Sequence, residues 1–173
     1  FEAYLKALSL DPSDVDVLRY VDELGQKLML WNELVSAYSK AIEASTDDEQ
    51  KVALMLKMAQ IQNDKLQNVE DAKATLVGIL KIDSENIEAA RKLADIYTAM
   101  GDNSALLDVL ARIAELTYEV AAQKDLLFRC ADIALNTLNL VQRGTAFLEK
   151  IVELDDSDMN AIEPLLVLYQ EAE

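Results

Sequence analysis

The chain contains no histidine, and its 173 residues include one cysteine, two prolines and four glycines. Without histidine it lacks the commonest general base of enzymes and the commonest protein ligand of transition metals. The single cysteine, Cys130, cannot form an internal disulfide, so nothing in the sequence requires an oxidising compartment. We therefore predict a cytoplasmic protein that is not an enzyme and has no catalytic residues, cofactor or metal site.

The sequence also lacks a long apolar run and an excess of positive charge. A membrane-spanning helix needs about 20 apolar residues, and no stretch approaches that length, which predicts no direct insertion into a membrane. The 32 acidic and 16 basic residues give a net charge of −16, which opposes binding to the phosphates of nucleic acids. We expect other proteins or peptides as partners, and no nucleic acid. Because the sequence begins at Phe1 and not at Met, we also expect it to be part of a longer protein.

The residues that are abundant predict helices. Hydrophobic residues make up 51% of the chain and aromatic residues only 6%, while Ala, Leu, Glu and Lys, which favour helices, are common. The period-two alternation of β-branched and aromatic residues that is typical of strands is missing. With so few glycines and prolines for tight turns, the composition predicts an all-α fold.

A repeat of 72 residues runs through the chain. Three similar segments, LDPSDVDVL, IDSENIEAA and LDDSDMNAI, begin at Leu10, Ile82 and Leu154, which are 72 residues apart. Each period contains two helical hairpins, so the repeating unit has about 36 residues. The predicted organisation is a partial repeat over residues 1–14, complete repeats over 15–50, 51–86, 87–122 and 123–158, and a partial repeat over 159–173.

Capping residues and turn residues set the expected ends of the helices. Ser13 or Asp14 is expected to cap the second helix, and Thr46 or Asp47 the fourth. Pro12 should end the first helix, and Pro164 should delay the start of the last helix or kink it. The expected helices cover residues 1–10, then from the cap at Ser13 or Asp14 to 27, 31–44, from the cap at Thr46 or Asp47 to 65, 69–82, two helices within 87–117 that meet at Gly101-Asp102, and then 120–138, 141–154 and 158–169.

The hairpin from Ile87 to Thr117 resembles the tetratricopeptide repeats. It matches the family's pattern of small, aromatic, turn and apolar positions at Leu93-Ala94, Tyr97, Gly101-Asp102, Leu110 and Ile113. The resemblance extends over essentially the whole chain. It implies that residues 1–173 form a single right-handed α-solenoid of antiparallel helix hairpins. The chain departs from the pattern at Asp22 and Leu166 on first helices and at Leu34 and Leu106 on second helices, where the family has small residues.

The resemblance also implies a ligand groove on the first helices of the hairpins, which line the concave face of such a solenoid. Each complete first helix carries a cation near its middle, and polar or aromatic side chains flank these cations. The predicted partner-binding residues are Arg19, Tyr20, Lys57, Gln60, Asn63, Arg91, Lys92, Asp95, Phe128 and Arg129. Such a track suits an extended acidic peptide or a carboxylate at the C-terminus of a partner. The alternative is that the cations only neutralise acidic residues four positions away, as in the pairs Arg19–Glu23, Glu88–Lys92, Arg91–Asp95 and Asp125–Arg129.

Three other features have structural as well as functional interpretations. The acidic stretch 155–160 begins like a calcium loop, but Ala161 and Val167 replace the glycine and the glutamate that the loop needs, which favours a capped turn. Cys130 aligns with Met58 under the 72-residue shift, which favours a buried core residue over a reactive thiol. Trp31 either packs over a hairpin turn or forms an exposed contact with a partner.

The predicted function is that of a scaffold or adaptor, which binds partner proteins or peptides through the groove and the lateral surfaces of the solenoid. The alternative is a structural assembly segment that packs end to end or self-associates within a larger complex. Apolar side chains at the uncapped ends, notably Leu165, Leu168 and Tyr169, would carry that association.

Overall fold

The computed structural model describes residues 1–11 and 14–171, and within these ranges it contains helices and no strands. The all-α prediction is confirmed. The elements are α1 (Glu2–Leu10), α2 (Val15–Lys27), α3 (Trp31–Ala44), α4 (Asp48–Asp64), α5 (Val69–Ile82), α6 (Ile87–Met100), α7 (Asn103–Glu115), α8 (Val120–Asp132), the π-helical turn η1 (Ile133–Thr137), α9 (Val141–Leu154) and α10 (Met159–Glu171). These bounds lie close to the expected ones. Pro12 and Ser13, expected to end α1 and to cap α2, lie outside the described residues.

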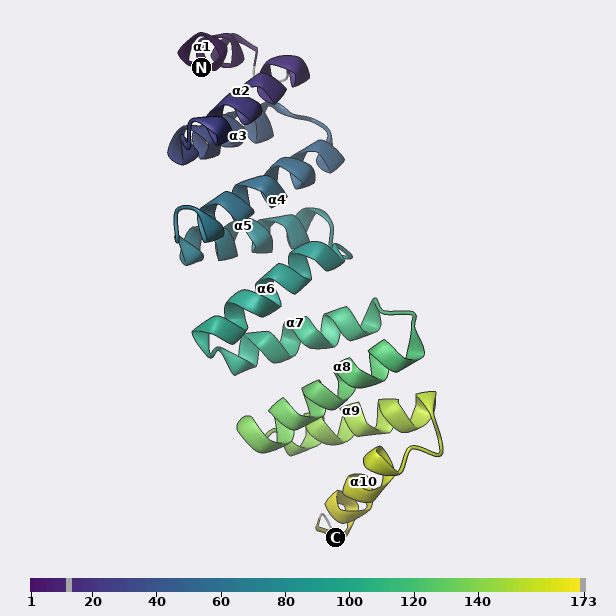
Figure 1. Ribbon diagram of the computed structural model, residues 1–173. Coiled ribbons are helices and arrows are strands. Elements are labelled where there is room, and N and C mark those ends of the chain that lie inside the picture. The colour runs from purple at the N-terminus through teal and green to yellow at the C-terminus, as the bar shows by residue number, and fades with distance from the viewer. Residues whose placement is uncertain (12–13, 172–173) are drawn as a thin grey trace. The chain divides into compact units, whose positions relative to one another are not determined.

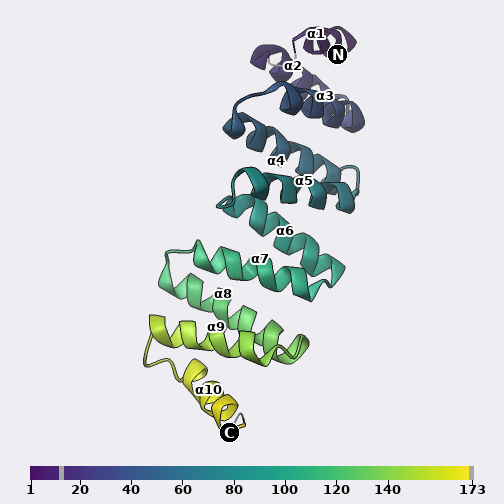
Figure 2. The same cartoon turned by 180° about the vertical axis from the view of Figure 1, so that it is seen from behind.

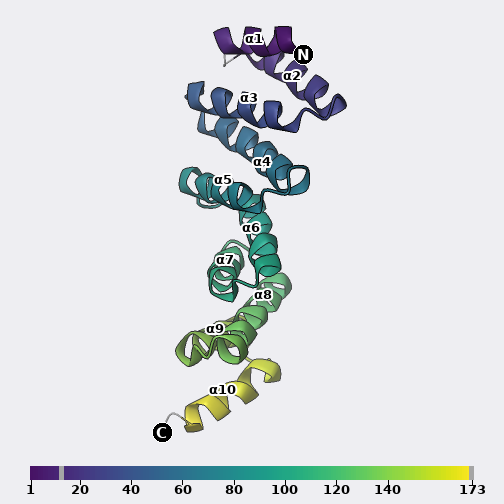
Figure 3. The same cartoon turned by 90° about the vertical axis from the view of Figure 1, so that its left-hand side faces the viewer.

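Contacts divide the chain into two compact units, Phe1–Ala89 and Ala90–Glu173. Unit 1 contains α1 to α5, and unit 2 contains most of α6 and all of α7 to α10. Within each unit, consecutive helices reverse direction and lie against each other. Figure 1 and Figure 2 show this from opposite sides for the hairpin of α4 and α5, and Figure 3 shows it from a third direction for α8 and α9.

The 72-residue period of the sequence is repeated in the turns that lead from one hairpin to the next. Asp14 caps α2 by accepting a hydrogen bond from the Val17 N–H at 3.0 Å. One period later, the side chain of Asn86 accepts from the Ala89 N–H at 2.9 Å, and after another period Asp158 accepts from the Asn160 N–H at 3.1 Å. An oxygen-bearing side chain therefore satisfies an otherwise unpaired N–H at the start of a helix in every copy of the segment.

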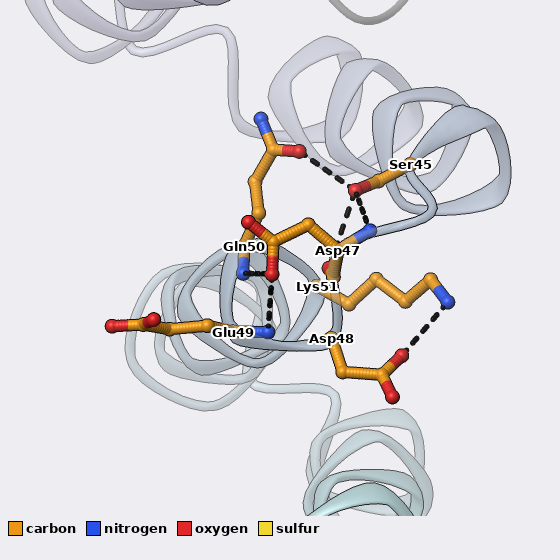
Figure 4. A network of polar contacts seen from close by, with 6 residues as sticks. All are labelled: Ser45, Asp47, Asp48, Glu49, Gln50 and Lys51. Atoms are coloured by element: carbon orange, nitrogen blue, oxygen red, sulfur yellow. Dashed lines mark hydrogen bonds and ion pairs between the residues drawn. The ribbon is translucent and has the colours of Figure 1, made fainter.

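The turn between α3 and α4 contains a denser version of this cap (Figure 4). Asp47, one of the two residues expected to cap α4, accepts from the Glu49 N–H at 2.9 Å. Ser45 closes the preceding helix, where its hydroxyl accepts from the Asp47 N–H at 3.2 Å and donates to Gln50 at 2.7 Å. In the acidic run at residues 47–49, Asp47 therefore forms the cap, and Asp48 pairs with Lys51 at 3.0 Å in the first turn of α4.

The turns inside the hairpins follow the same period, in two alternating forms. In the shorter form one residue has left-handed backbone, Met29 at φ 58° and Gly101 at φ 70°, which are 72 positions apart. A backbone hydrogen bond closes each of these turns, from Leu30 to Gly25 at 2.8 Å in one case and from Asp102 to Tyr97 at 3.0 Å in the other. The two copies share this turn geometry although only one of them has glycine at the left-handed position.

In the longer form, a wider backbone hydrogen bond closes the turn. The Leu140 N–H donates to the Ala134 carbonyl at 2.7 Å, and the Asn68 N–H donates to the Gln62 carbonyl at 2.7 Å, one period earlier. Each of these bonds spans six residues, which is one residue more than the bond that closes the shorter turn. The left-handed residue directly precedes the donor, at φ 52° in Gln67 and φ 54° in Asn139. The wider turn explains how alternate hairpins hold an extra residue between their two helices.

The two helices of a hairpin approach closely where a small residue faces a large one. A Cβ atom added to Gly25 on α2 would lie 2.6 Å from the side chain of Leu34 on α3. In the last hairpin the roles are exchanged, because a Cβ atom added to Gly144 on α9 would lie 2.3 Å from Leu135 in η1. Leu34 thus departs from the family pattern without loss of packing, since the small residue stands on the other helix.

The buried residues agree with most of the expected apolar stripes. Leu34, Tyr38 and Ile79, for example, have no side-chain exposure. Two expectations are wrong. The spacing of four residues from Leu24 predicts that Leu28 belongs to the inner face of α2, but Leu28 is 55% exposed because it lies beyond the helix end. Leu165, expected at an exposed end surface, is 6% exposed because it packs in α10 against its unit.

The start of α10 also differs from expectation. Pro164 lies inside the helix, which begins at Met159 directly after its cap, so the predicted late start is wrong. Proline removes one N–H from the helix and clashes with the preceding turn, an effect that amounts to about 3 kcal/mol in a helix interior. The burial of Ala161 and Leu165 on either side of Pro164 keeps this first turn and a half of the helix in place.

The left-handed residues at matching positions of the two shorter turns lead to a reciprocal stability prediction. We expect Met29→Gly to stabilise the protein by about 1 kcal/mol, because glycine adopts left-handed backbone without the steric penalty of a side chain. Gly101→Met should destabilise it by a similar amount. Side-chain packing contributes little to either change, since Met29 is 72% exposed and nothing lies within 4 Å of a Cβ atom added to Gly101. Urea denaturation measures both, and equal stability of the three proteins would contradict the assignment.

Candidate functional site

A groove of about 430 Å³ lies in unit 2 between three consecutive helices. Its floor is apolar and comes from α6, α7 and α8, whereas its rim is charged. The lining residues are Arg91, Ala94, Asp95, Leu110, Ile113, Thr117, Ala122, Asp125, Leu126 and Arg129. The groove therefore brings together three of the predicted partner-binding residues, namely Arg91, Asp95 and Arg129.

The four charged residues of the rim do not neutralise one another. In the described part of the chain, Arg91, Asp95 and Asp125 take part in no ion pair, and Arg129 contacts only the hydroxyl of Thr98, at 3.5 Å. The expected pairs Arg91–Asp95 and Asp125–Arg129 are therefore wrong. Two arginines and two aspartates face the groove with their charges available to a ligand.

The positions of these charges along the groove follow from the helix directions. Because α7 reverses the direction of α6 and α8 reverses that of α7, α6 and α8 run in the same direction. The contact between Arg129 and Thr98 sets their register. On α6, Arg91 precedes Asp95 by about one turn, and on α8, Asp125 precedes Arg129 by about one turn. The charge order along the groove is thus an arginine, two aspartates and an arginine.

The other two predicted residues of unit 2 do not line the groove. Lys92 and Phe128 are both half-buried and stand next to lining residues on their helices. Asp125 was considered only as a partner of Arg129, and Leu110 and Ile113 of α7 only as positions of the repeat pattern, so none of the three was predicted to bind a ligand. Leu110 and Ile113 are almost fully buried, at 2% and 3% exposure.

In unit 1, Arg19 and Tyr20 belong to a layered cluster at the surface. The guanidinium of Arg19 lies 4.7 Å from the centre of the Tyr20 ring, and that ring stacks on Tyr4 of α1 at 5.2 Å. Arg19 also forms ion pairs with Asp16 at 3.7 Å and with Glu23 at 3.5 Å. The expected pair Arg19–Glu23 is confirmed. Tyr4 lies on the helix before the first complete hairpin, so a search of first helices alone missed it.

Lys57, the second predicted cation, is bound to an acidic residue of the neighbouring hairpin. Its amino group lies 2.7 Å from Asp22, whose other oxygen accepts from the fully buried Tyr38 at 2.5 Å. Burial raises the pKa of Asp22, but hydrogen bonds from Lys57, Tyr38 and Gln26 outweigh it and hold the pKa below its ordinary value. Asp22 thereby joins α2, α3 and α4, which explains its presence where the family has a small residue.

Gln60 and Asn63 complete the predicted set. Both are exposed on α4, and the amide of Asn63 donates to its neighbour Asp64 at 2.8 Å. They lie one and two turns after Lys57 on the same helix. In unit 1 the predicted residues therefore occupy the surfaces of α2 and α4.

The reactive and acidic features have structural roles. Cys130 is fully buried, and burial raises the pKa of its thiol to about 11. The amino group of Lys124 lies 2.7 Å from the carboxylate of Asp155 and 2.6 Å from that of Asp158. In the stretch that begins like a calcium loop, the positive charge beside these carboxylates is therefore that of a lysine. The hydrogen bond from Lys124 lowers the pKa of Asp155 to about 2. The capped-turn interpretation of this stretch is confirmed.

Trp31 is half-buried against the core of unit 1, and the amino group of Lys65 lies 5.5 Å from the centre of its ring. This agrees with packing over the hairpin turn. Among the described helices, none has the length and the apolar content that a membrane crossing requires.

Solved structures that resemble this chain include several tetratricopeptide repeat proteins. The protein YrrB, described as having an unusual peptide-binding site, is 17% identical, with a TM-score of 0.54 over 93% of this chain and 79% of its own. PilF of Pseudomonas aeruginosa is 14% identical, with a TM-score of 0.56 over 99% of this chain and 72% of its own. MamA is 17% identical, with a TM-score of 0.53 over 90% and 80%.

No protein-family model and no curated protein matches the sequence. At identities this low the structural likeness concerns the fold. The chain has the tetratricopeptide repeat fold, and the resemblance seen in its sequence is confirmed at that level.

The polar contact between the hairpins of unit 1 leads to a stability prediction. Asp22→Ala restores the small residue of the family but leaves the buried hydroxyl of Tyr38 without its acceptor, so we expect a loss of about 1–3 kcal/mol. Asp22→Asn is the matched control, because its amide oxygen still accepts from Tyr38, and should lose less. Thermal and urea denaturation measure both variants. An alanine variant as stable as the wild type would show that the site needs only a small side chain.

Proposed function

We propose that this chain is a non-enzymatic scaffold that binds segments of partner proteins, and that the groove between α6 and α8 is its principal contact site. The observation that carries the proposal is the combination of an apolar floor with four charged rim residues that form no ion pairs among themselves. Apolar area supplies affinity and fixed charges supply orientation, which is the usual division of roles in a binding groove.

The comparisons support a protein-interaction scaffold in general terms, since the similar structures include tetratricopeptide repeat proteins and one of them is described by its peptide-binding site. The chemistry of the chain agrees with a role in binding. It has no histidine to act as a general base, and its single thiol is buried with a raised pKa that disfavours the reactive thiolate.

The predicted residues of unit 1 form a second proposed contact surface, on α2 and α4. Arg19 and Tyr20 present a cation on an aromatic ring, and Gln60 and Asn63 present exposed amides. Arginine, tyrosine and amide side chains are well suited to contacts with a peptide. Lys57 remains 54% exposed although it is bound to Asp22, so its amino group can still form a further contact.

The groove is tested by reversing its two cations. We expect the double substitution Arg91→Glu and Arg129→Glu to reduce the capture of partner proteins by the immobilised chain at least tenfold, as measured by quantitative mass spectrometry. The matched control reverses Arg143 and Lys150, two cations of α9 outside the groove, so that both variants carry the same net charge. Equal capture by the two variants would overturn the assignment of the groove, and circular dichroism checks that both remain folded.

A second candidate function, self-association, is favoured by the surface of α10. Leu166 and Val167 are 55% and 52% exposed, and Leu166 lines a groove of about 370 Å³ that α10 forms with α9. The net charge of −16 opposes contact between two copies.

If α10 mediates self-association, the association should strengthen as salt screens this repulsion. Light scattering over a concentration series at low and high ionic strength measures it, with Leu166→Ser and Val167→Ser together as the disrupting variant. A monomer under all conditions would exclude this function.

A further inference from the structure

The order of charges in the groove of unit 2 specifies the kind of peptide that fits it. This inference rests on the proposed function and adds the chemistry of the ligand. Arg91 stands at one end, Asp95 and Asp125 stand in the middle, and Arg129 stands beside Thr98 at the other end. A complementary segment has an acidic side chain at each end and a basic side chain between them.

The distances along the helices set the spacing of these side chains. From the level of Arg91 to that of Thr98 is seven residues of helix, or about 10 Å at 1.5 Å per residue. An extended chain rises about 3.3 Å per residue and places alternate side chains on one face. Side chains at the first, third and fifth positions of a five-residue segment therefore span about 13 Å, and the long arginine side chains can take up the difference.

The groove floor favours lysine or arginine at the central position. Ala94 and Leu126, which line the groove next to Asp95 and Asp125 in the chain, add apolar surface to the floor beside the two aspartates. The methylene groups of a long basic side chain can lie along such a surface while its charged end reaches the carboxylates. A short basic group without this stem would leave the floor uncovered.

We propose that the groove of unit 2 binds extended peptide segments of the form acidic–x–basic–x–acidic, in which the acidic residues contact Arg91 and Arg129 and the basic residue lies between Asp95 and Asp125. Because the whole protein is acidic, preference for a peptide with a net negative charge would have to come from the groove itself. A chain with a net charge of −16 attracts cationic peptides in general, whereas this segment has a net charge of −1 when both acids and the base are ionised.

The proposal is tested with three labelled peptides, acetylated and amidated at their ends, whose binding is measured by fluorescence polarisation. The first is Glu-Ala-Lys-Ala-Glu, the second has the same composition in the order Glu-Glu-Ala-Ala-Lys, and the third is the inverted Lys-Ala-Glu-Ala-Lys. We expect the wild type to bind the first at least tenfold more tightly than the other two. Equal binding of the three, or tighter binding of the inverted peptide, would overturn the proposal.

A charge-inverted protein supplies the reciprocal test. Arg91→Glu, Asp95→Lys, Asp125→Lys and Arg129→Glu together leave the net charge unchanged, and should transfer the preference to Lys-Ala-Glu-Ala-Lys. If that variant does not fold, the double variant Asp95→Asn and Asp125→Asn, which is nearly isosteric with the wild type, provides the test. It should weaken the binding of Glu-Ala-Lys-Ala-Glu at least tenfold. Unchanged binding by the asparagine variant contradicts the proposed role of the aspartates.

Failure of this inference differs from failure of the proposed function. If reversal of Arg91 and Arg129 abolishes the capture of partner proteins while the three peptides bind equally, the groove is a contact site but the order of its charges does not select the ligand. If reversal of these arginines leaves capture unchanged and the peptides bind equally, both proposals are wrong.

Discussion

Each helix of this protein has an apolar face that it can bury only against its neighbours, and the remaining features of each unit follow from that requirement. Adjacent helices can pack closely only where a large side chain meets a small one. The pairs Gly25 with Leu34 and Gly144 with Leu135 meet this condition with the roles of the two helices exchanged. The small residue can therefore move from one helix to the other during divergence, provided that its partner changes with it.

The polar residues of unit 1 show how a departure from the repeat pattern is accommodated. A carboxylate at Asp22 replaces a small side chain between helices, and it is stable there because it accepts from Tyr38 and pairs with Lys57. A partly buried charge requires such partners, since desolvation alone would disfavour it. Through the same ion pair Lys57 connects two hairpins, while its side chain remains partly exposed at the surface.

The groove of unit 2 lacks an equivalent arrangement, and this difference distinguishes a candidate binding site from a structural contact. Arg91, Asp95, Asp125 and Arg129 line a space with an apolar floor and form no ion pairs with one another. Charges held at fixed intervals on rigid helices can orient a ligand in a groove and select among ligands, while an apolar floor excludes water from the contact.

The sequence by itself determined the helices, their ends and the 72-residue period, because these depend on neighbouring residues. Capping by Asp14 and Asp47 involves an N–H only two or three positions away, and the left-handed turns at Met29 and Gly101 recur with the sequence. Only the tertiary structure decided which surface charges are paired. Lys57 meets Asp22 from another hairpin, whereas Arg91 and Asp95 do not meet although they stand four residues apart on one helix. Spacing along a helix limits which side chains can meet, but packing between helices and the choice of rotamers determine which of them do.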